Sequence, residues 1–400
     1  MTAPWHSFLA RAVARTYFNR ITLLSPERLP KSGPVLYLGL HRNGAVDGFV
    51  YSSVLPRSTF MISTQLRKSL LGRLFFSGIE VVRQKDEGDP KANEEALGRC
   101  REHLKSGGEL FVFPEGTSTL GPRHLPFKSG AARILCDYLE TGGPITVVPL
   151  AISYEAPGSF RSNVEIAVGL RVSTEFPDSM AAHDRLCEMR RRMAVALEEV
   201  GVNVESEAIQ EKIQKLAYAS TLATPRSYHQ SLKTFEKAIP GPIERNWIEL
   251  EPQIRARSLL THQGIPLFPM KHAWLYFLAL VVTGPLVVAG GLVNLVPLVG
   301  AWLAGRTLAD GPNVISLWRI LVGVPLFFLW VAGALAASIL LHRLPAFGAY
   351  LLLTLVAGWL YYRVKKLSVA VVNLIFHPGL RARMLAFRES VLEALANEGA

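Results

Sequence analysis

A histidine and an aspartate lie six positions apart in the stretch Val35–Asp47, which reads VLYLGLHRNGAVD. Histidine can take up a proton near neutral pH, and a carboxylate bonded to one ring nitrogen fixes the tautomer and orientation of the ring. The pair His41 and Asp47 is therefore a candidate general base. A polar loop whose aspartate caps the following helix is the non-catalytic interpretation of the same residues.

The elements that must position this pair are a strand and a helix. Val35–Leu40 is an apolar run with the length and composition of a buried strand, and His41 follows it directly. A second apolar segment begins after Gly44, which places Asp47 in the first turn of a helix. Open α/β sheets bind their ligands at the carboxyl edge of the strands, so His41 is expected at a binding edge.

A second motif follows about seventy residues later, where the strand candidate Leu110–Phe113 leads into PEGTST. His41 and Asp47 followed by this FPEGTST motif resemble the glycerolipid acyltransferases of the 1-acylglycerol-3-phosphate acyltransferase family. Three weaker blocks resemble further segments of that family, namely Gly78–Arg83, Phe127–Ala131 and Val148–Ile152. The resemblance covers residues 33–154.

The resemblance implies that His41 deprotonates the acceptor hydroxyl directly, that Asp47 holds the imidazole, and that no acyl-enzyme forms. It also implies that the acceptor is bound by Arg83, Glu115, Gly116 and Thr117, with Arg83 contacting a phosphate. The acyl donor, an acyl-CoA or an acyl-carrier protein, is a co-substrate. No cofactor and no metal is implied.

Two positions depart from the family pattern. Five residues separate His41 from Asp47 where the pattern has four, and Gly44 can absorb the extra residue because glycine tolerates a positive φ. Ser118 stands where the pattern carries an arginine. We expect Arg123 or Lys128 to supply the missing positive charge.

Composition narrows the class of partner. The chain has 400 residues, half of them hydrophobic, a formal charge of +11 and a pI of about 9.7. Basic chains bind nucleic acids, anionic membrane surfaces or acidic substrates. The sequence has no zinc-finger spacing, no RNA-binding signature and no dense lysine and arginine run, so no nucleic-acid partner is expected. Its three scattered cysteines fit neither a disulfide framework nor a metal site and indicate a reducing compartment.

Alternating apolar strands and helical patterns over residues 33–169 predict an α/β fold, a mainly parallel sheet flanked by helices. Helices alone are expected beyond it. The predicted organisation is 1–30 an amphipathic membrane-surface helix, 31–177 the α/β domain, 178–270 a helical segment, 271–366 membrane-embedded apolar helices and 367–400 an amphipathic C-terminal helix. For the first segment, a helix packed on the protein's own core is the alternative.

Three apolar segments are long enough for membrane helices, namely Ala273–Leu303, Val314–Leu341 and Ala346–Tyr362. Positive charge flanks this region on both sides, which predicts an even number of crossings with the α/β domain facing the cytoplasm. We expect Ala273–Leu303 not to cross, because Pro285 and the pair Gly290-Gly291 can break it.

We therefore expect a membrane-bound O-acyltransferase of phospholipid biosynthesis, whose partners are membrane lipids, the acyl donor and a glycerolipid acceptor such as 1-acylglycerol-3-phosphate. Acylation of glycerol-3-phosphate or of another lysolipid is the alternative within the class. A catalytically silent lipid-binding relative is the alternative outside it, favoured by the longer spacing between His41 and Asp47. A transporter is disfavoured because the apolar segments contain no acidic residue, Asp310 lying between them.

Overall fold

The computed structural model describes residues 4–82, 90–257 and 259–397. It divides into two compact units, each described by itself. The sheet unit comprises residues 1–158, 163–205 and 309–317. The helical unit comprises residues 159–162, 206–308 and 318–400.

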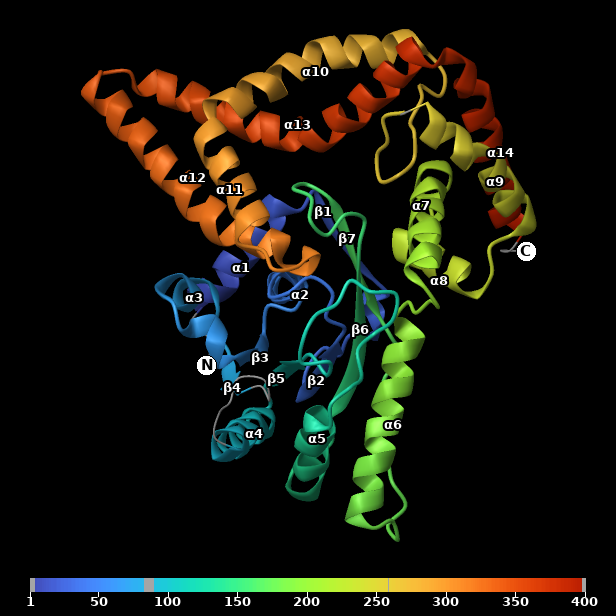
Figure 1. The fold of residues 1–400 in the computed structure, drawn as a ribbon. Helices are drawn as coiled ribbons and strands as arrows, with labels where there is room; N and C mark the ends of the chain where they lie inside the picture. The colour runs from blue at the N-terminus through green and yellow to red at the C-terminus, as the bar shows by residue number, and fades with distance from the viewer. Residues whose placement is uncertain (1–3, 83–89, 258, 398–400) are drawn as a thin grey trace. The chain divides into compact units, whose positions relative to one another are not determined.

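The sheet unit is built on a seven-stranded sheet in the order β1-β7-β6-β2-β5-β3-β4, as far as the described residues show (Figure 1). All neighbouring strands are parallel except β6 and β7, which confirms the predicted, mainly parallel sheet. The strands are β1 Arg20–Leu24, β2 Val35–Gly39, β3 Ser58–Ser63, β4 Ile79–Val81, β5 Glu109–Val112, β6 Thr146–Tyr154 and β7 Asn163–Val168.

Helices cover both faces of the sheet, and its central strands are therefore buried on both sides. On one face, Leu36 of β2 and Leu110 of β5 belong to a fully buried cluster with side chains of α4, α5 and α6. On the other face, Phe111 packs against Tyr51 of α2, with ring centroids 4.6 Å apart. The helices of this unit are α1 Pro4–Tyr17, α2 Val46–Val54, α3 Leu70–Phe75, α4 Pro90–Lys105, α5 Gly130–Thr141 and α6 Ala182–Val200.

Gly39, the last residue of β2, leaves room for the ring of Phe111. A Cβ added at Gly39 would lie 2.3 Å from Phe111 Cζ and 3.3 Å from Tyr51 Cε2. We expect Gly39→Ala to destabilise the sheet unit by about 1–3 kcal/mol, because the fully buried rings must shift. Thermal unfolding measures this. Gly98→Ala in α4 is the control: an added Cβ there meets only Arg101 Nη2 at 3.7 Å, so a comparable loss in both variants would contradict the packing argument.

The N-terminal segment differs from the predicted single helix over residues 1–30. Helix α1 ends at Tyr17, and Arg20–Leu24 form β1, which pairs with β7 in parallel. Val13 and Ala14 of α1 are buried and the helix packs against α2, as the alternative interpretation expected for this face. Trp5 and Phe8 remain exposed.

The boundary after residue 177 also differs, because α6 belongs to the sheet unit. Met189, Met193 and Leu197 of this helix join the cluster beneath β2 and β6. Helix α6 follows the last strand and still belongs to the core of the sheet unit. The charged residues that led us to predict a separate helical segment from residue 178 lie on the outer face of this helix.

The helical unit contains helices of two kinds. The polar ones are α7 Glu207–Ala223, α8 Tyr228–Lys237, α9 Gly241–Ala256 and α14 Arg381–Asn397. The apolar ones are α10 Ala273–Val293, α11 Leu295–Thr307, α12 Ile315–Leu340 and α13 Leu344–Phe376, with α12 belonging to the sheet unit up to Leu317. Helix α8 was not predicted, although the capping box of Ser227 and Gln230 marks its start in the sequence.

Among the described residues, three apolar helices are long enough to cross a membrane, namely Ala273–Val293, Pro312–Leu340 and Leu344–Phe376. The predicted break at Pro285 or Gly290-Gly291 is wrong, because α10 continues through both and ends before Asn294. Gly290 instead permits close helix packing, since a Cβ there would lie 2.2 Å from Ala357 Cβ of α13. The number of crossings stays a prediction.

Candidate active site

The histidine and the aspartate meet at the carboxyl end of β2. His41 Nδ1 lies 2.8 Å from Asp47 Oδ2, which confirms the predicted contact despite the five-residue spacing. Gly44 adopts a positive φ of 54°, so the glycine absorbs the extra residue as expected. The side chain of Asp47 is completely buried, whereas that of His41 is 15% exposed.

Both carboxylate oxygens of Asp47 accept hydrogen bonds from neighbouring residues. Its Oδ2 also accepts backbone N–H bonds from Arg42 at 2.6 Å and Asn43 at 2.9 Å. Its Oδ1 accepts a 2.5 Å hydrogen bond from the hydroxyl of Tyr154, at the end of β6. A carboxylate accepts hydrogen bonds, so this contact favours the tautomer in which His41 Nδ1 carries the proton and Nε2 is the nitrogen that can act as a base.

Tyr154 is a site residue that the sequence reasoning did not single out. Burial and the nearby charge of Asp47 raise the pKa of Tyr154 well above its ordinary value, so its hydroxyl stays protonated and donates to the carboxylate. The only signal in the sequence was its place two residues after the predicted strand and the block Val148–Ile152, where a side chain can reach the same sheet edge as His41.

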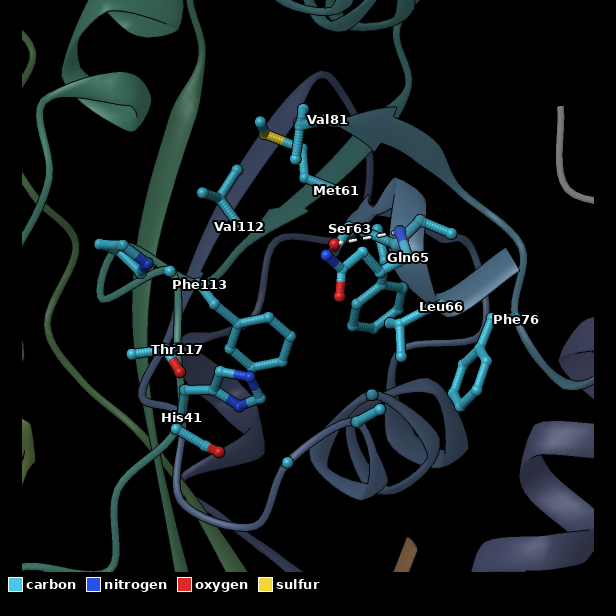
Figure 2. Close-up of a pocket in the computed structure, with 18 of the residues that line it drawn as sticks. His41, Met61, Ser63, Gln65, Leu66, Phe76, Val81, Val112, Phe113 and Thr117 are labelled. Atoms are coloured by element: carbon cyan, nitrogen blue, oxygen red, sulfur yellow. Dashed lines mark hydrogen bonds between the residues drawn. The ribbon is translucent and has the colours of Figure 1, made fainter. Parts of the chain in front are cut away.

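The imidazole of His41 is also fixed from the side. Its ring stacks on that of Phe113, with centroids 4.1 Å apart and planes inclined by 22°. Figure 2 shows the two rings face to face at the edge of the cavity, with Thr117 beside His41. Phe113 comes directly after β5, the neighbour of β2, so adjacent strands position both rings.

Glu115, a predicted ligand of the acceptor, is buried behind the cavity wall and bonds the protein's own backbone. It is 1% exposed and is not among the residues that line the cavity. Its Oε2 accepts a 2.6 Å bond from the backbone N–H of His41, and its Oε1 accepts one of 3.1 Å from that of Leu125. Both carboxylate oxygens of Glu115 therefore bond to the protein's own backbone, because the β5 loop folds against the β2 loop, and the contact of Glu115 with the acceptor stays a prediction.

Burial raises the pKa of Glu115 above its ordinary value, and the backbone donors of His41 and Leu125 and the charges of His41 and Arg42 offset only part of this rise. We expect Glu115→Gln to destabilise the fold by about 1–3 kcal/mol, because an amide turns one N–H group toward a backbone donor. The acyl transfer expected from the sequence should fall at least tenfold as the His41 loop loses its anchor. The matched control is Glu102→Gln on α4, an exposed carboxylate; an unchanged melting temperature and activity in Glu115→Gln would refute the anchoring role.

A cavity of about 780 Å³ opens beside His41. Its polar end includes Gly116, Thr117, Ser118 and Lys128, so three of the predicted acceptor-binding residues line it. Gly116 has a φ of 69°, and a Cβ there would lie 3.1 Å from Lys128 Nζ, which places the ammonium group over the loop. Apolar side chains also line the cavity, among them Met61, Leu66, Phe76, Val81 and Val112, which Figure 2 shows together with Ser63 and Gln65. Phe49 and Phe60 are further apolar lining residues.

Of the other cationic side chains near the site, Arg133 lines the cavity and Arg123 does not. Arg133 of α5 lines the cavity, although the sequence reasoning did not select it. Arg123, the alternative to Lys128, is not among the lining residues and directs its Nε toward the carbonyl of Val204. The predicted phosphate ligand Arg83 lies outside the described residues. Within the part of the chain that the structure describes, no group of three metal-ligating side chains is assembled.

Part of the chain is similar to known acyltransferases. Residues 20–153 match the Acyltransferase family model. The chain is 29% identical over 150 residues to the chloroplastic 1-acyl-sn-glycerol-3-phosphate acyltransferase of Brassica napus, covering 36% of this chain and 42% of that protein. It is 30% identical over 152 residues to the chloroplastic enzyme of the same name from Arabidopsis thaliana, covering 37% and 41%.

The chain thus spans about two fifths of the length of these curated relatives. Among solved structures, the 1-acyl-sn-glycerophosphate acyltransferase PlsC from Thermotoga maritima matches with 17% sequence identity and a TM-score of 0.35. That match covers 50% of this chain and 83% of that one.

Proposed function

We propose that this chain, whose residues 20–153 form a domain of the acyltransferase family, transfers a fatty acyl group from a thioester to a hydroxyl of a lysophospholipid such as 1-acylglycerol-3-phosphate. The donor is an acyl-CoA or an acyl-carrier protein. The observation that carries the proposal is the pair of His41 and Asp47, 2.8 Å apart, with His41 lining a cavity whose walls carry both apolar side chains and cations.

In the proposed reaction, His41 Nε2 removes the proton of the acceptor hydroxyl as the oxygen bonds to the thioester carbonyl carbon. The tetrahedral intermediate collapses by breaking the carbon–sulfur bond, and the thiolate receives the proton from the imidazolium. Asp47 stabilises that imidazolium and holds the ring through Nδ1. The products are the ester and the free thiol, with no covalent acyl-enzyme.

The lining of the cavity supports a long-chain acyl substrate with a charged headgroup. Phenylalanine, leucine, valine and methionine side chains offer the acyl chain an apolar surface. Lys128 and Arg133 line the cavity and can pair with a phosphate, to which Arg83 remains a further predicted ligand. Ser118, in place of an arginine, keeps another lysolipid or glycerol-3-phosphate as the alternative acceptor. The intact contact of His41 with Asp47 argues against a silent relative.

We further propose that the protein acts on a membrane with its sheet unit facing the cytoplasm. The three apolar helices support membrane attachment, and the donors are cytoplasmic. Lys365 and Lys366, near the C-terminal end of the apolar region, support a cytoplasmic tail by the positive-inside rule. An even number of crossings follows from this orientation.

The test is acyl transfer by the full chain reconstituted in phospholipid vesicles. Radiolabelled acyl-CoA and acyl-carrier protein are each offered with 1-acylglycerol-3-phosphate, other lysophospholipids and glycerol-3-phosphate. We expect the label to move to 1-acylglycerol-3-phosphate and the thiol to be released in equal amount. Label in none of the acceptors, with donor and acceptor both shown to bind, would exclude the proposed reaction.

A further inference from the structure

Residues 309–317 belong to the sheet unit, although they follow the residues matched by the family model by more than one hundred and fifty positions. They connect α11 to the start of α12. Several of them line the cavity, namely Asp310, Gly311, Asn313, Val314 and Leu317. One wall of the candidate active site is therefore supplied by a short segment between two apolar helices, which we call the wall segment.

The wall segment binds the loop that follows β5. The amide nitrogen Nδ2 of Asn313 donates to Ser118 Oγ at 2.6 Å and to the carbonyl oxygen of Ser118 at 3.2 Å. Both amide hydrogens of Asn313 can therefore be used by this one residue. The next residue, Thr119, donates its backbone N–H to the carbonyl of His41 at 3.1 Å. Asn313 is thus connected, through Ser118 and Thr119, to the loop that begins at His41.

The same segment also touches the loop that carries His41. A Cβ added at Gly44 would lie 2.9 Å from the carbonyl oxygen of Asn313 and 3.2 Å from Val314 Cγ1. Gly44 and Ser118 lie at the two places where this sequence departs from the acyltransferase pattern. Both departures therefore face one segment, which occupies the space that a larger side chain at either position would need.

The wall segment is anchored in the sheet unit. Ser316 is completely buried, its hydroxyl donates to the carbonyl of Pro157, and it accepts a 3.1 Å bond from the hydroxyl of Tyr17. The side-chain amide of Asn43 donates to the same Pro157 carbonyl at 3.0 Å. Because Asn43 also bonds Asp47, the anchor of the wall segment and the carboxylate of the catalytic pair share a support.

We propose that Asn313 is a positioning residue of the acyl-transfer site and that the wall segment forms part of the subsite for the acceptor headgroup. The proposal rests on the proposed function. Asn313 acts through Ser118: it fixes the Thr117 and Ser118 loop, which borders the polar end of the cavity, against the loop of His41. The family-matched residues alone would therefore leave this subsite without one wall.

The test compares wild type, Asn313→Ala and Asn313→Leu in the full chain in vesicles. Leucine keeps about the size of the side chain but can neither donate to Ser118 nor accept from it, so Asn313→Leu gives the result if the alanine variant does not fold. Loss of two hydrogen bonds should raise the KM for 1-acylglycerol-3-phosphate about tenfold, while the KM for acyl-CoA changes less than about twofold. A Ser118→Ala and Asn313→Ala double variant should be no worse than Asn313→Ala, because both act on one contact.

A binding measurement separates this proposal from the proposed function. The probe is the acceptor analogue that lacks the reacting hydroxyl, and its Kd should rise about tenfold in Asn313→Ala. The control is Asn19→Ala, which removes a side-chain amide bond to Asn163 in the same unit, away from the cavity. It should leave both acceptor KM and analogue Kd unchanged.

Unchanged acceptor KM and analogue Kd in folded Asn313 variants would overturn the positioning role, and so would additive effects in the double variant. A wild-type protein that binds the analogue more tightly than Asn313→Ala, yet transfers no acyl group to any acceptor, would overturn the proposed function and leave the role of Asn313 in the subsite standing.

Discussion

His41→Ala is expected to lower acyl transfer by about 10²–10⁴-fold, because it removes the general base that we propose for the acceptor hydroxyl. Nδ1 of His41 bonds Asp47 and the ring stacks on Phe113, which leaves Nε2 as the ring nitrogen proposed to take the proton. The variant should still fold, since the side chain is partly exposed and its backbone N–H still reaches Glu115. Turnover is measured with labelled acyl-CoA at saturating acceptor.

The control for this variant is His183→Ala, an exposed histidine on α6 of the same unit. Its activity should match the wild type. Circular dichroism and vesicle flotation report whether His41→Ala keeps its fold and its membrane association. Turnover within threefold of the wild type would mean that His41 is not the base and would overturn the proposed mechanism.

Asp47→Asn is expected to lower turnover by about 10³–10⁴-fold, through the tautomer of the histidine rather than through its loss. The amide group of an asparagine can donate to Nδ1, so the proton moves to Nε2 and the base is lost. Stability should fall as well, because Oδ2 accepts backbone N–H bonds from Arg42 and Asn43 in the wild type. Pre-steady-state kinetics and thermal unfolding together measure the two effects.

The Tyr154→Phe variant tests how much the orientation of Asp47 matters when the tautomer of His41 is unchanged. It removes the single hydrogen bond to Asp47 Oδ1 and leaves the contact of Oδ2 with His41 in place. The loss in turnover should be about tenfold, far smaller than in Asp47→Asn. If Tyr154→Phe were as inactive as Asp47→Asn, the tyrosine hydroxyl would take part in the reaction itself and the proposed division of roles would be refuted.

The sequence predicted the central part of the site because its determinants are local. A buried strand, a polar residue at its end and a carboxylate in the first helical turn all lie within thirteen residues, from Val35 to Asp47. Parallel pairing of β2 with β5 then brings the two motif loops together. The positive φ of Gly44 was also predictable, since an inserted residue needs a backbone conformation that glycine adopts freely.

The parts that could not be predicted depend on distant partners. β1 is a five-residue, half-buried strand whose pairing with β7 spans more than one hundred and forty residues. Glu115 carries the motif expected of an acceptor ligand, and only the fold shows that its oxygens are occupied by backbone donors of His41 and Leu125. Asn313 sits in a polar connection between apolar helices, and nothing in its neighbourhood indicates a contact with Ser118.

The wall segment has a consequence for truncated forms of the protein. A fragment ending at Glu205 would contain the whole seven-stranded sheet, the family-matched region and every residue of the His41 and Asp47 network. It would nevertheless lack Asn313 and Ser316, and so expose Ser118, Gly44 and the carbonyl of Pro157 to water. Such a fragment can keep the His41 base and still lose its selectivity for the acceptor. Acceptor selectivity measured on a fragment of this kind would therefore not represent that of the full chain.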